Sequence, residues 1–103
     1  MVKYRYHRQA ERELEEAADY YQEKSQRAAS NFLRDYENSL HYILNFPEGT
    51  SIIEKLVRPK SLLDFPFTIH YMFYDNIVYI VAVAHQSRRP GYWKDRLKEA
   101  RFD

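Results

Sequence analysis

The chain of 103 residues has no cysteine, only 2 glycines, and no apolar run near the roughly 20 residues that a membrane-spanning helix needs. The lack of cysteine excludes disulfides, thiolate nucleophiles and thiolate metal sites. No glycine-rich phosphate loop is present, and neither is a His-Glu-x-x-His or Gly-x-Ser-x-Gly motif. The amino terminus carries no apolar secretory signal. We therefore expect a cytoplasmic protein that uses no metal and no cofactor.

One small globular domain accounts for the length and the composition. Domains most often have about 100–150 residues, so residues 1–103 are assigned to a single domain. Apolar residues make up 45% of the chain, too many for a disordered one. The net charge of +1 conceals an asymmetry, because residues 1–50 carry 7 basic and 9 acidic side chains and residues 51–103 carry 9 and 6. This excess indicates either a phosphate-attracting patch or a solvated helix end near the carboxyl terminus.

The first half of the chain predicts a strand followed by two helices. Residues 2–7 alternate apolar and basic side chains, which is the period of a half-buried strand. From about Arg8 the apolar residues recur every three or four positions, the period of a helix. Ser25 interrupts this pattern as an N-cap for a second helix, which Pro47 ends. Two amphipathic helices joined by so few residues should form an antiparallel hairpin that covers a sheet.

The second half predicts three strands and a short helix, at 51–58, 67–74, 77–84 and 90–100. A tight Asp-Asn turn joins the last two strands, and its two-residue length pairs Thr68 with Val83. In this register Ala82 faces the helices. His70 and His85 then lie on the opposite, mixed face, where we expect a partner to bind.

The segment 82–97 contains the residue types most suited to act on a nucleic acid. They are a histidine at a strand end, two arginines, two aromatic residues and a lysine, namely His85, Arg88, Arg89, Tyr92, Trp93 and Lys94. Histidine can transfer protons near neutral pH, arginine binds phosphate, and aromatic rings stack on bases. The alternative is that His85 and Gln86 hydrogen-bond the loop backbone while Trp93 pins the last helix to the sheet.

Two further cations, Arg58 and Lys60, precede the strand pair. We predict that they converge with Arg88 and Arg89 about one shallow hollow that neither helix covers. The four histidines of the chain do not have the spacing of a metal site.

Three stretches of the chain are those of a known family. They are Ala-x-x-Glu-Leu-Glu-Glu-Ala at 10–17, Phe-Pro-Phe-Thr-Ile-His-Tyr at 65–71, and the run 82–97. With them the sequence resembles the RelE/ParE superfamily of bacterial toxins from type II toxin–antitoxin systems. The resemblance implies an α+β fold with an N-terminal strand, a helical hairpin packed on a curved antiparallel sheet of three to four strands, and a short C-terminal helix. It also implies a growth-inhibiting protein of the plasmid-stabilisation type, neutralised by an antitoxin encoded beside it.

The resemblance leaves the target open, because RelE-like members cut mRNA in the ribosome and ParE-like members inhibit DNA gyrase. In a nuclease the implied catalytic residues are His85, Arg88, Arg89 and Tyr92. The residues expected to bind a nucleic acid or another target are Arg58, Lys60, Arg88, Arg89, Trp93 and Lys94. Thr68 stands where many relatives have an arginine, which favours a ParE-like toxin that binds gyrase. The alternatives are a ribosome-dependent mRNA endoribonuclease and a degenerate toxin that retains only antitoxin binding.

The charge asymmetry and the mixed sheet face also suggest how the antitoxin binds. We expect a short, acidic, amphipathic segment to cover part of the basic carboxyl-terminal region. A homodimer, or a heterotetramer with the antitoxin, is compatible with this arrangement.

Overall fold

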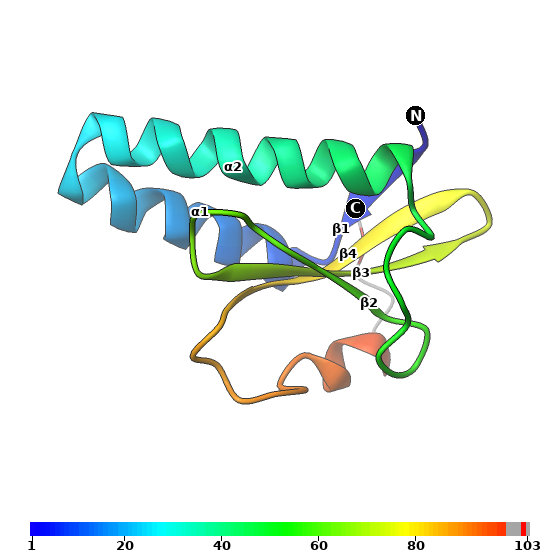
Figure 1. Ribbon diagram of the computed structural model, residues 1–103. Helices are drawn as coiled ribbons and strands as arrows, with labels where there is room; N and C mark the ends of the chain where they lie inside the picture. Colours follow the sequence, from blue (N-terminus) through cyan, green and yellow to red (C-terminus); the bar gives the residue numbers. More distant parts are fainter. Residues whose placement is uncertain (99–101, 103) are drawn as a thin grey trace.

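The computed structural model describes residues 1–98 and 102 (Figure 1). It contains β1 (Lys3–Tyr6), α1 (Arg8–Lys24), α2 (Gln26–Asn45), β2 (Arg58–Ser61), β3 (Phe67–Tyr74), β4 (Ile77–His85) and the 3₁₀ helix η1 (Lys94–Lys98). Figure 1 shows the two long helices on one face of the sheet and the C-terminal segment on the other. This architecture confirms the predicted α+β fold. Within the described residues, no helix is long and apolar enough to cross a membrane.

The sheet has the strand order β1-β4-β3-β2. β2 pairs with β3 and β3 with β4 in antiparallel fashion, whereas β1 runs parallel to β4. The sheet is therefore mixed, with β1 and β2 at its edges. The helical hairpin connects the edge strand β1 to the rest of the sheet and packs on it as one layer.

Both long helices begin at side chains that cap them. The Nδ1 atom of His7 accepts a hydrogen bond from the Gln9 backbone N–H at 3.1 Å, and the Ser25 hydroxyl accepts one from the Ala28 N–H at 2.9 Å. These bonds satisfy backbone donors that have no partner inside the helix. The predicted N-cap at Ser25 is confirmed.

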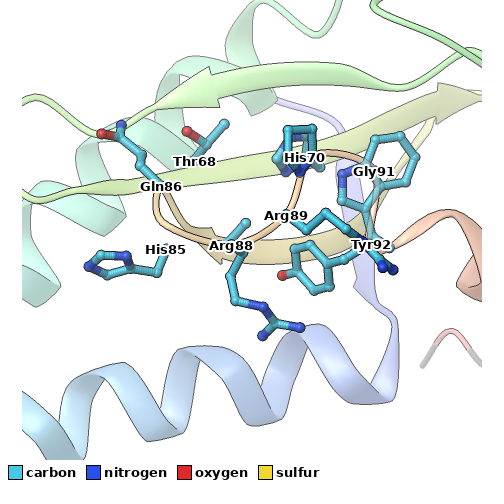
Figure 2. A pocket seen from close by; sticks show the side chains of 11 residues that line it. Thr68, His70, His85, Gln86, Arg88, Arg89, Gly91 and Tyr92 are labelled. Atoms are coloured by element: carbon cyan, nitrogen blue, oxygen red, sulfur yellow. The ribbon is translucent and has the colours of Figure 1, made fainter.

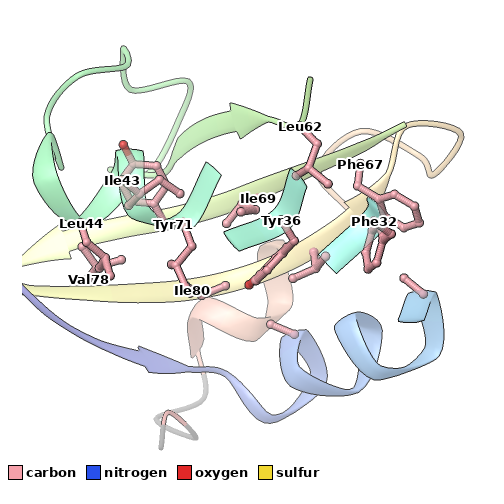
Figure 3. Packing of buried hydrophobic residues seen from close by; sticks show 14 residues of the cluster. Phe32, Tyr36, Ile43, Leu44, Leu62, Phe67, Ile69, Tyr71, Val78 and Ile80 are labelled. Atoms are coloured by element: carbon pink, nitrogen blue, oxygen red, sulfur yellow. The ribbon is translucent and has the colours of Figure 1, made fainter. Parts of the chain in front are cut away.

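The main core fills the space between the helical hairpin and the sheet (Figure 3). Side chains of α2 meet those of β3 and β4 there, among them Phe32, Tyr36, Ile43, Ile69 and Ile80, all almost fully buried. Apolar burial of this kind is worth about 25 cal/mol per Å² removed from water, so this layer supplies most of the folding free energy.

The strand predicted at 51–58 is wrong. Lys55 and Leu56 have φ angles of 50° and 68°, and together they form a tight turn closed by the hydrogen bond from the Val57 N–H to the Glu54 carbonyl. The actual strand, β2, begins at Arg58 and includes Pro59. Because β2 is an edge strand, the missing N–H of proline costs no bond of the sheet.

The predicted hairpin register is correct near the turn and wrong beyond it. Asp75 and Asn76 adopt positive φ angles as expected, but a β-bulge between His70 and Tyr71 shifts the register by one residue. Thr68 therefore pairs with Ala84 instead of Val83. The bulge turns Val83 and His85 toward the helices and Ala82 toward the opposite face, so the faces predicted for Ala82 and His85 are both wrong. His85 pairs with Phe67 of the main core, and the centres of their rings are 5.1 Å apart.

A second, smaller core lies on the face of the sheet away from the helices. It is formed by Val57, Val81, Ala82 and Trp93. Trp93 is only 2% exposed, so it fixes the C-terminal segment to the sheet. This is the packing role that the sequence analysis gave as the alternative to base stacking. The helix expected at 90–100 is shorter, because turns precede η1; residues 99 and 100 of that prediction lie outside the described residues.

Candidate functional site

A cavity of about 210 Å³ opens where β4 ends and the following loop folds back over the sheet (Figure 2). Its lining comes from Thr68 and His70 of β3 and from residues 84–86 and 88–93. We call it the basic hollow, because these lining residues include two arginines and two histidines and no carboxylate. The loop shape depends on Gly91, whose φ of 76° favours glycine.

Two arginines stand at the rim of the basic hollow. The Arg88 guanidinium lies 3.8 Å from the centre of the Tyr92 ring, and its side chain is 52% exposed. Its nearest anion is Glu13, at 4.0 Å. Arg89 is exposed, and its side chain forms no ion pair or hydrogen bond within the described residues. Arg88 is therefore held by stacking, and Arg89 is free to meet a ligand.

Beside the hollow, Glu13 of α1 forms the centre of a polar network. Arg96 donates two parallel hydrogen bonds to its carboxylate, each 2.8 Å long. The Tyr92 hydroxyl donates another at 2.6 Å, and the backbone N–H of Val83 donates a fourth at 3.0 Å. Glu13 thus joins α1, β4 and the C-terminal segment in one cluster.

This network also bonds the backbone of β4 beyond the point where its pairing with β1 ends. β1 pairs with β4 only as far as Ile80, so the next residues of β4 have β3 on one side and no paired strand on the other among the described residues. Arg96 donates a hydrogen bond to the Val81 carbonyl at 3.0 Å, and Glu13 accepts from Val83. The side chains of Glu13 and Arg96 therefore provide hydrogen-bond partners for backbone groups of β4 that a neighbouring strand would otherwise bond.

Hydrogen bonding also sets the protonation states in the network. Burial by itself would raise the pKa of Glu13, but the bonds from Arg96, Tyr92 and Val83 outweigh it and lower that pKa below its usual range. Burial and the bond to this carboxylate raise the pKa of the Tyr92 hydroxyl well above its ordinary value. At neutral pH, Glu13 is a carboxylate, Arg96 is a cation and Tyr92 keeps its proton.

The two histidines of the hollow have different environments. His70 packs against Trp93, with 5.2 Å between ring centres, and burial lowers its pKa to about 4, so it is neutral at pH 7. Its Nδ1 is buried and has no hydrogen-bond partner among the described residues. The Nδ1 of His85 accepts from the Ser87 backbone N–H at 3.0 Å, as the loop-bracing alternative predicted.

The predicted convergence of four cations is wrong. Arg58 donates a hydrogen bond to the Thr50 carbonyl and lies 3.8 Å from the Glu48 carboxylate. Lys60 lies over the Tyr42 ring, 4.9 Å from its centre. Both side chains alternate with Pro59 along β2 and contact residues near the end of α2, whereas Arg88 and Arg89 line the hollow. Alternation along a strand explains this, because successive side chains point to opposite faces.

The third predicted target-binding residue outside the hollow is Lys94. Its ammonium group lies 3.0 Å from the Glu54 carboxylate, so it ties the C-terminal segment to the turn before β2. Of the six residues predicted to bind a target, only three line the hollow, namely Arg88, Arg89 and Trp93.

A family model for the ParE toxin of type II toxin–antitoxin systems, parDE, matches residues 4–90. The chain belongs to this family. No curated protein sequence matches it. The match begins at the second residue of β1, includes both helices and strands β2 to β4, and ends in the loop that lines the basic hollow.

Membership of the ParE toxin family confirms the resemblance to the RelE/ParE superfamily. The protein is a toxin of a type II toxin–antitoxin system, and such a toxin has an antitoxin as its partner. Tyr92, Trp93 and Arg96 of the ParE toxin lie beyond the matched residues, so the part of the site that closes over β4 is described by its geometry alone.

Sequence analysis missed two residues of the toxin that organise this site, Glu13 and Arg96. Glu13 lies three residues after Ala10 and four before Ala17, which places it on the buried stripe of α1. Arg96 follows Trp93 by three residues. The position of Glu13 on an apolar stripe could have indicated its role, because burial of a single charge is costly and implies a partner of opposite charge.

Proposed function

We propose that this toxin stops growth by binding DNA gyrase and that it does not cleave RNA. The observation that supports the proposal is the Glu13 network, in which Arg96, a group that could bind phosphate, and the Tyr92 hydroxyl, a group that could transfer a proton, are both bonded to Glu13. A ribosome-dependent endoribonuclease would need the same groups free to contact the RNA.

RNA cleavage needs a base that takes the proton of the 2′-hydroxyl and an acid that protonates the leaving oxygen. The Tyr92 hydroxyl is not such a base, because it keeps its proton and donates a hydrogen bond to Glu13, and its pKa is raised. His85 is poorly arranged as well. Since its Nδ1 accepts the Ser87 N–H, the neutral ring carries its proton on Nε2 and cannot accept another there.

The site also has few free positive charges to stabilise the pentavalent phosphorus in the transition state of RNA cleavage. Glu13 neutralises Arg96, and Thr68 stands where many relatives have an arginine. Arg88 and Arg89 remain. Losing one group that stabilises an oxyanion costs about 10²–10³ in rate, so a site without two such groups is a weak catalyst. The same rim of two exposed arginines suits binding to a macromolecule.

The proposal extends to the setting of the toxin. Gyrase acts on DNA in the bacterial cytoplasm, so the toxin acts there, and its gene pair stabilises a plasmid that carries it. An acidic antitoxin segment would neutralise it by covering the rim at Arg88 and Arg89, in a heterotetramer of two toxins and two antitoxins.

Two assays on the purified toxin test the proposal together. In the first, gyrase supercoils a relaxed plasmid at rising toxin concentration; in the second, a translation extract is probed for cut mRNA. We expect supercoiling to be inhibited and ribosome-bound mRNA to stay intact. Codon-positioned cleavage that is lost in His85→Ala would establish the nuclease instead, and no effect in either assay would identify a degenerate toxin.

Variants locate the binding surface in the first assay. Arg88→Gln and Arg89→Gln should raise the toxin concentration for half-inhibition. Arg27→Gln is the matched control, because Arg27 is an exposed arginine at the start of α2 and lines no cavity described in the structure. Equal losses in all three variants would show that inhibition depends on net charge and not on the hollow.

A further inference from the structure

The basic hollow has the electrostatics of an anion site. Its lining contains Arg88 and Arg89 and no aspartate or glutamate. The nearest carboxylate, Glu13, is already bonded to Arg96 through both oxygens, so it offsets little of the charge of the two rim arginines. His70 is neutral, because burial lowers its pKa to about 4. Arg88 shares Glu13 with Arg96 at 4.0 Å, and Arg89 has no ion pair among the described residues, so the lining of the hollow carries a net positive charge.

The two arginines are suited to different parts of one ligand. Arg88 is held against the Tyr92 ring at 3.8 Å, so little side-chain freedom is left to lose when it binds. Arg89 follows it directly and is free of any ion pair in the described residues. Guanidinium groups donate paired hydrogen bonds in the geometry that phosphate oxygens accept.

The size and the remaining lining of the hollow limit what can enter. A volume of about 210 Å³ is below the roughly 300 Å³ at which pockets for small organic ligands begin, and it is ample for one phosphate group. Neutral donors stand beside the arginines, the Gln86 side-chain amide and the Thr68 hydroxyl, which also shares a bond of 3.1 Å with Ser61. The base of the nucleotide would have to remain outside.

We infer that the basic hollow binds a single phosphate of a nucleic acid backbone through Arg88 and Arg89. The ligand is a phosphodiester, and the backbone that supplies it is DNA; this choice of DNA rests on the proposed function, because gyrase holds DNA strands. The toxin then contacts the nucleic acid as well as the enzyme. The toxin therefore binds gyrase more tightly when gyrase holds DNA.

The lone tryptophan of the chain makes this site measurable. Trp93 is the only tryptophan and lines the hollow, so its fluorescence reports ligands that enter there. The full-length toxin is titrated with a single-stranded DNA oligonucleotide, with RNA of the same sequence, and with inorganic phosphate, at several salt concentrations. We expect the DNA to bind, with an affinity that falls as salt rises.

Substitution of Arg89 gives the decisive comparison. Arg89→Gln should weaken DNA binding at least about five-fold and reduce the slope of log K against log salt by about 1, as for one lost phosphate contact. Arg27→Gln should change neither. Unaltered binding by Arg89→Gln, or equal loss in both variants, would overturn the phosphate site. Binding of RNA but not DNA would overturn the choice of DNA.

Failure of this inference can be separated from failure of the proposed function. If the wild-type toxin inhibits supercoiling but binds no oligonucleotide, the phosphate site is wrong and gyrase remains the target. If it binds DNA through Arg89 but leaves gyrase fully active, the site stands and the proposed target is wrong.

Discussion

Removal of the Glu13 carboxylate should strongly destabilise the toxin. In Glu13→Ala, the Arg96 cation loses its bidentate partner while its side chain remains only 10% exposed. Breaking a buried ion pair at one end costs about 3–5 kcal/mol. The Tyr92 hydroxyl and the Val83 N–H lose their acceptor too, but both lie at a partly wet boundary, so we expect about 3–5 kcal/mol in total.

Urea denaturation followed by circular dichroism measures this loss directly. A domain of this size has about 5–15 kcal/mol of stability, so the midpoint should fall by a large fraction. Glu15→Ala is the matched control, because Glu15 is an exposed glutamate of the same helix, and it should change the stability by less than about 0.5 kcal/mol.

A double-mutant cycle with Arg96→Met separates the ion pair from the packing of α1. Since Arg96 no longer has an unpaired charge in the double variant, the two losses should be strongly non-additive, with a coupling of about 2 kcal/mol or more. A loss below about 1 kcal/mol in Glu13→Ala, together with additive effects, would show that the pair of Glu13 and Arg96 is an ordinary surface contact.

Three further predictions concern the stability of the fold. Asp35 of α2 is buried and accepts the backbone N–H groups of residues 63, 64 and 65, so Asp35→Ala should cost about 2–3 kcal/mol in urea denaturation and leave that loop open to proteolysis; an unchanged midpoint would contradict this anchoring role. Leu56 has a φ of 68° and is 65% exposed, so Leu56→Gly should raise the melting temperature by relieving about 1 kcal/mol of backbone strain, and a lower melting temperature would show that the side chain packs after all. His70 has a folded pKa of about 4 against 6.5 when free, so the unfolded chain binds the extra proton between these values and stability should fall by about 1.4 kcal/mol for each pH unit from 6.5 down to 4. This slope should disappear in His70→Asn, whereas a slope that persists would assign it to other groups. The stabilisation from the ion pair of Glu13, whose pKa is lowered from 4.5, is complete above pH 4.5, so it affects only the acid end of this range.

The sequence predicted those parts of the fold that depend on neighbouring residues alone. The period of α1 and α2, the Ser25 cap and the Asp-Asn turn are local signals, and each is confirmed. The placement of β2 and the register of the β3–β4 pair failed for a common reason. No characteristic residue type indicates the turn at 55–56, which contains no glycine, or the bulge in β4. Packing against the rest of the molecule selects both features.

The candidate site was predicted in part for the same reason. The loop after β4 is contiguous in sequence, so Arg88, Arg89 and Tyr92 could be assigned to one place. Arg58 and Lys60 had to be placed through strand alternation, and the uncertain strand boundary made that impossible. Glu13 is 79 residues away from Tyr92, and only the closed structure shows that their side chains bond.

We propose that the toxin inhibits its target by binding, while the Tyr92 hydroxyl stays bonded to Glu13 and the Nδ1 of His85 to the Ser87 N–H. The most direct test maps the 5′ ends of ribosome-bound mRNA at a toxin concentration that fully inhibits gyrase supercoiling in a parallel reaction. We expect blocked supercoiling and the same 5′ ends as in the absence of toxin. New ends at defined codon positions, with supercoiling unaffected, would contradict it.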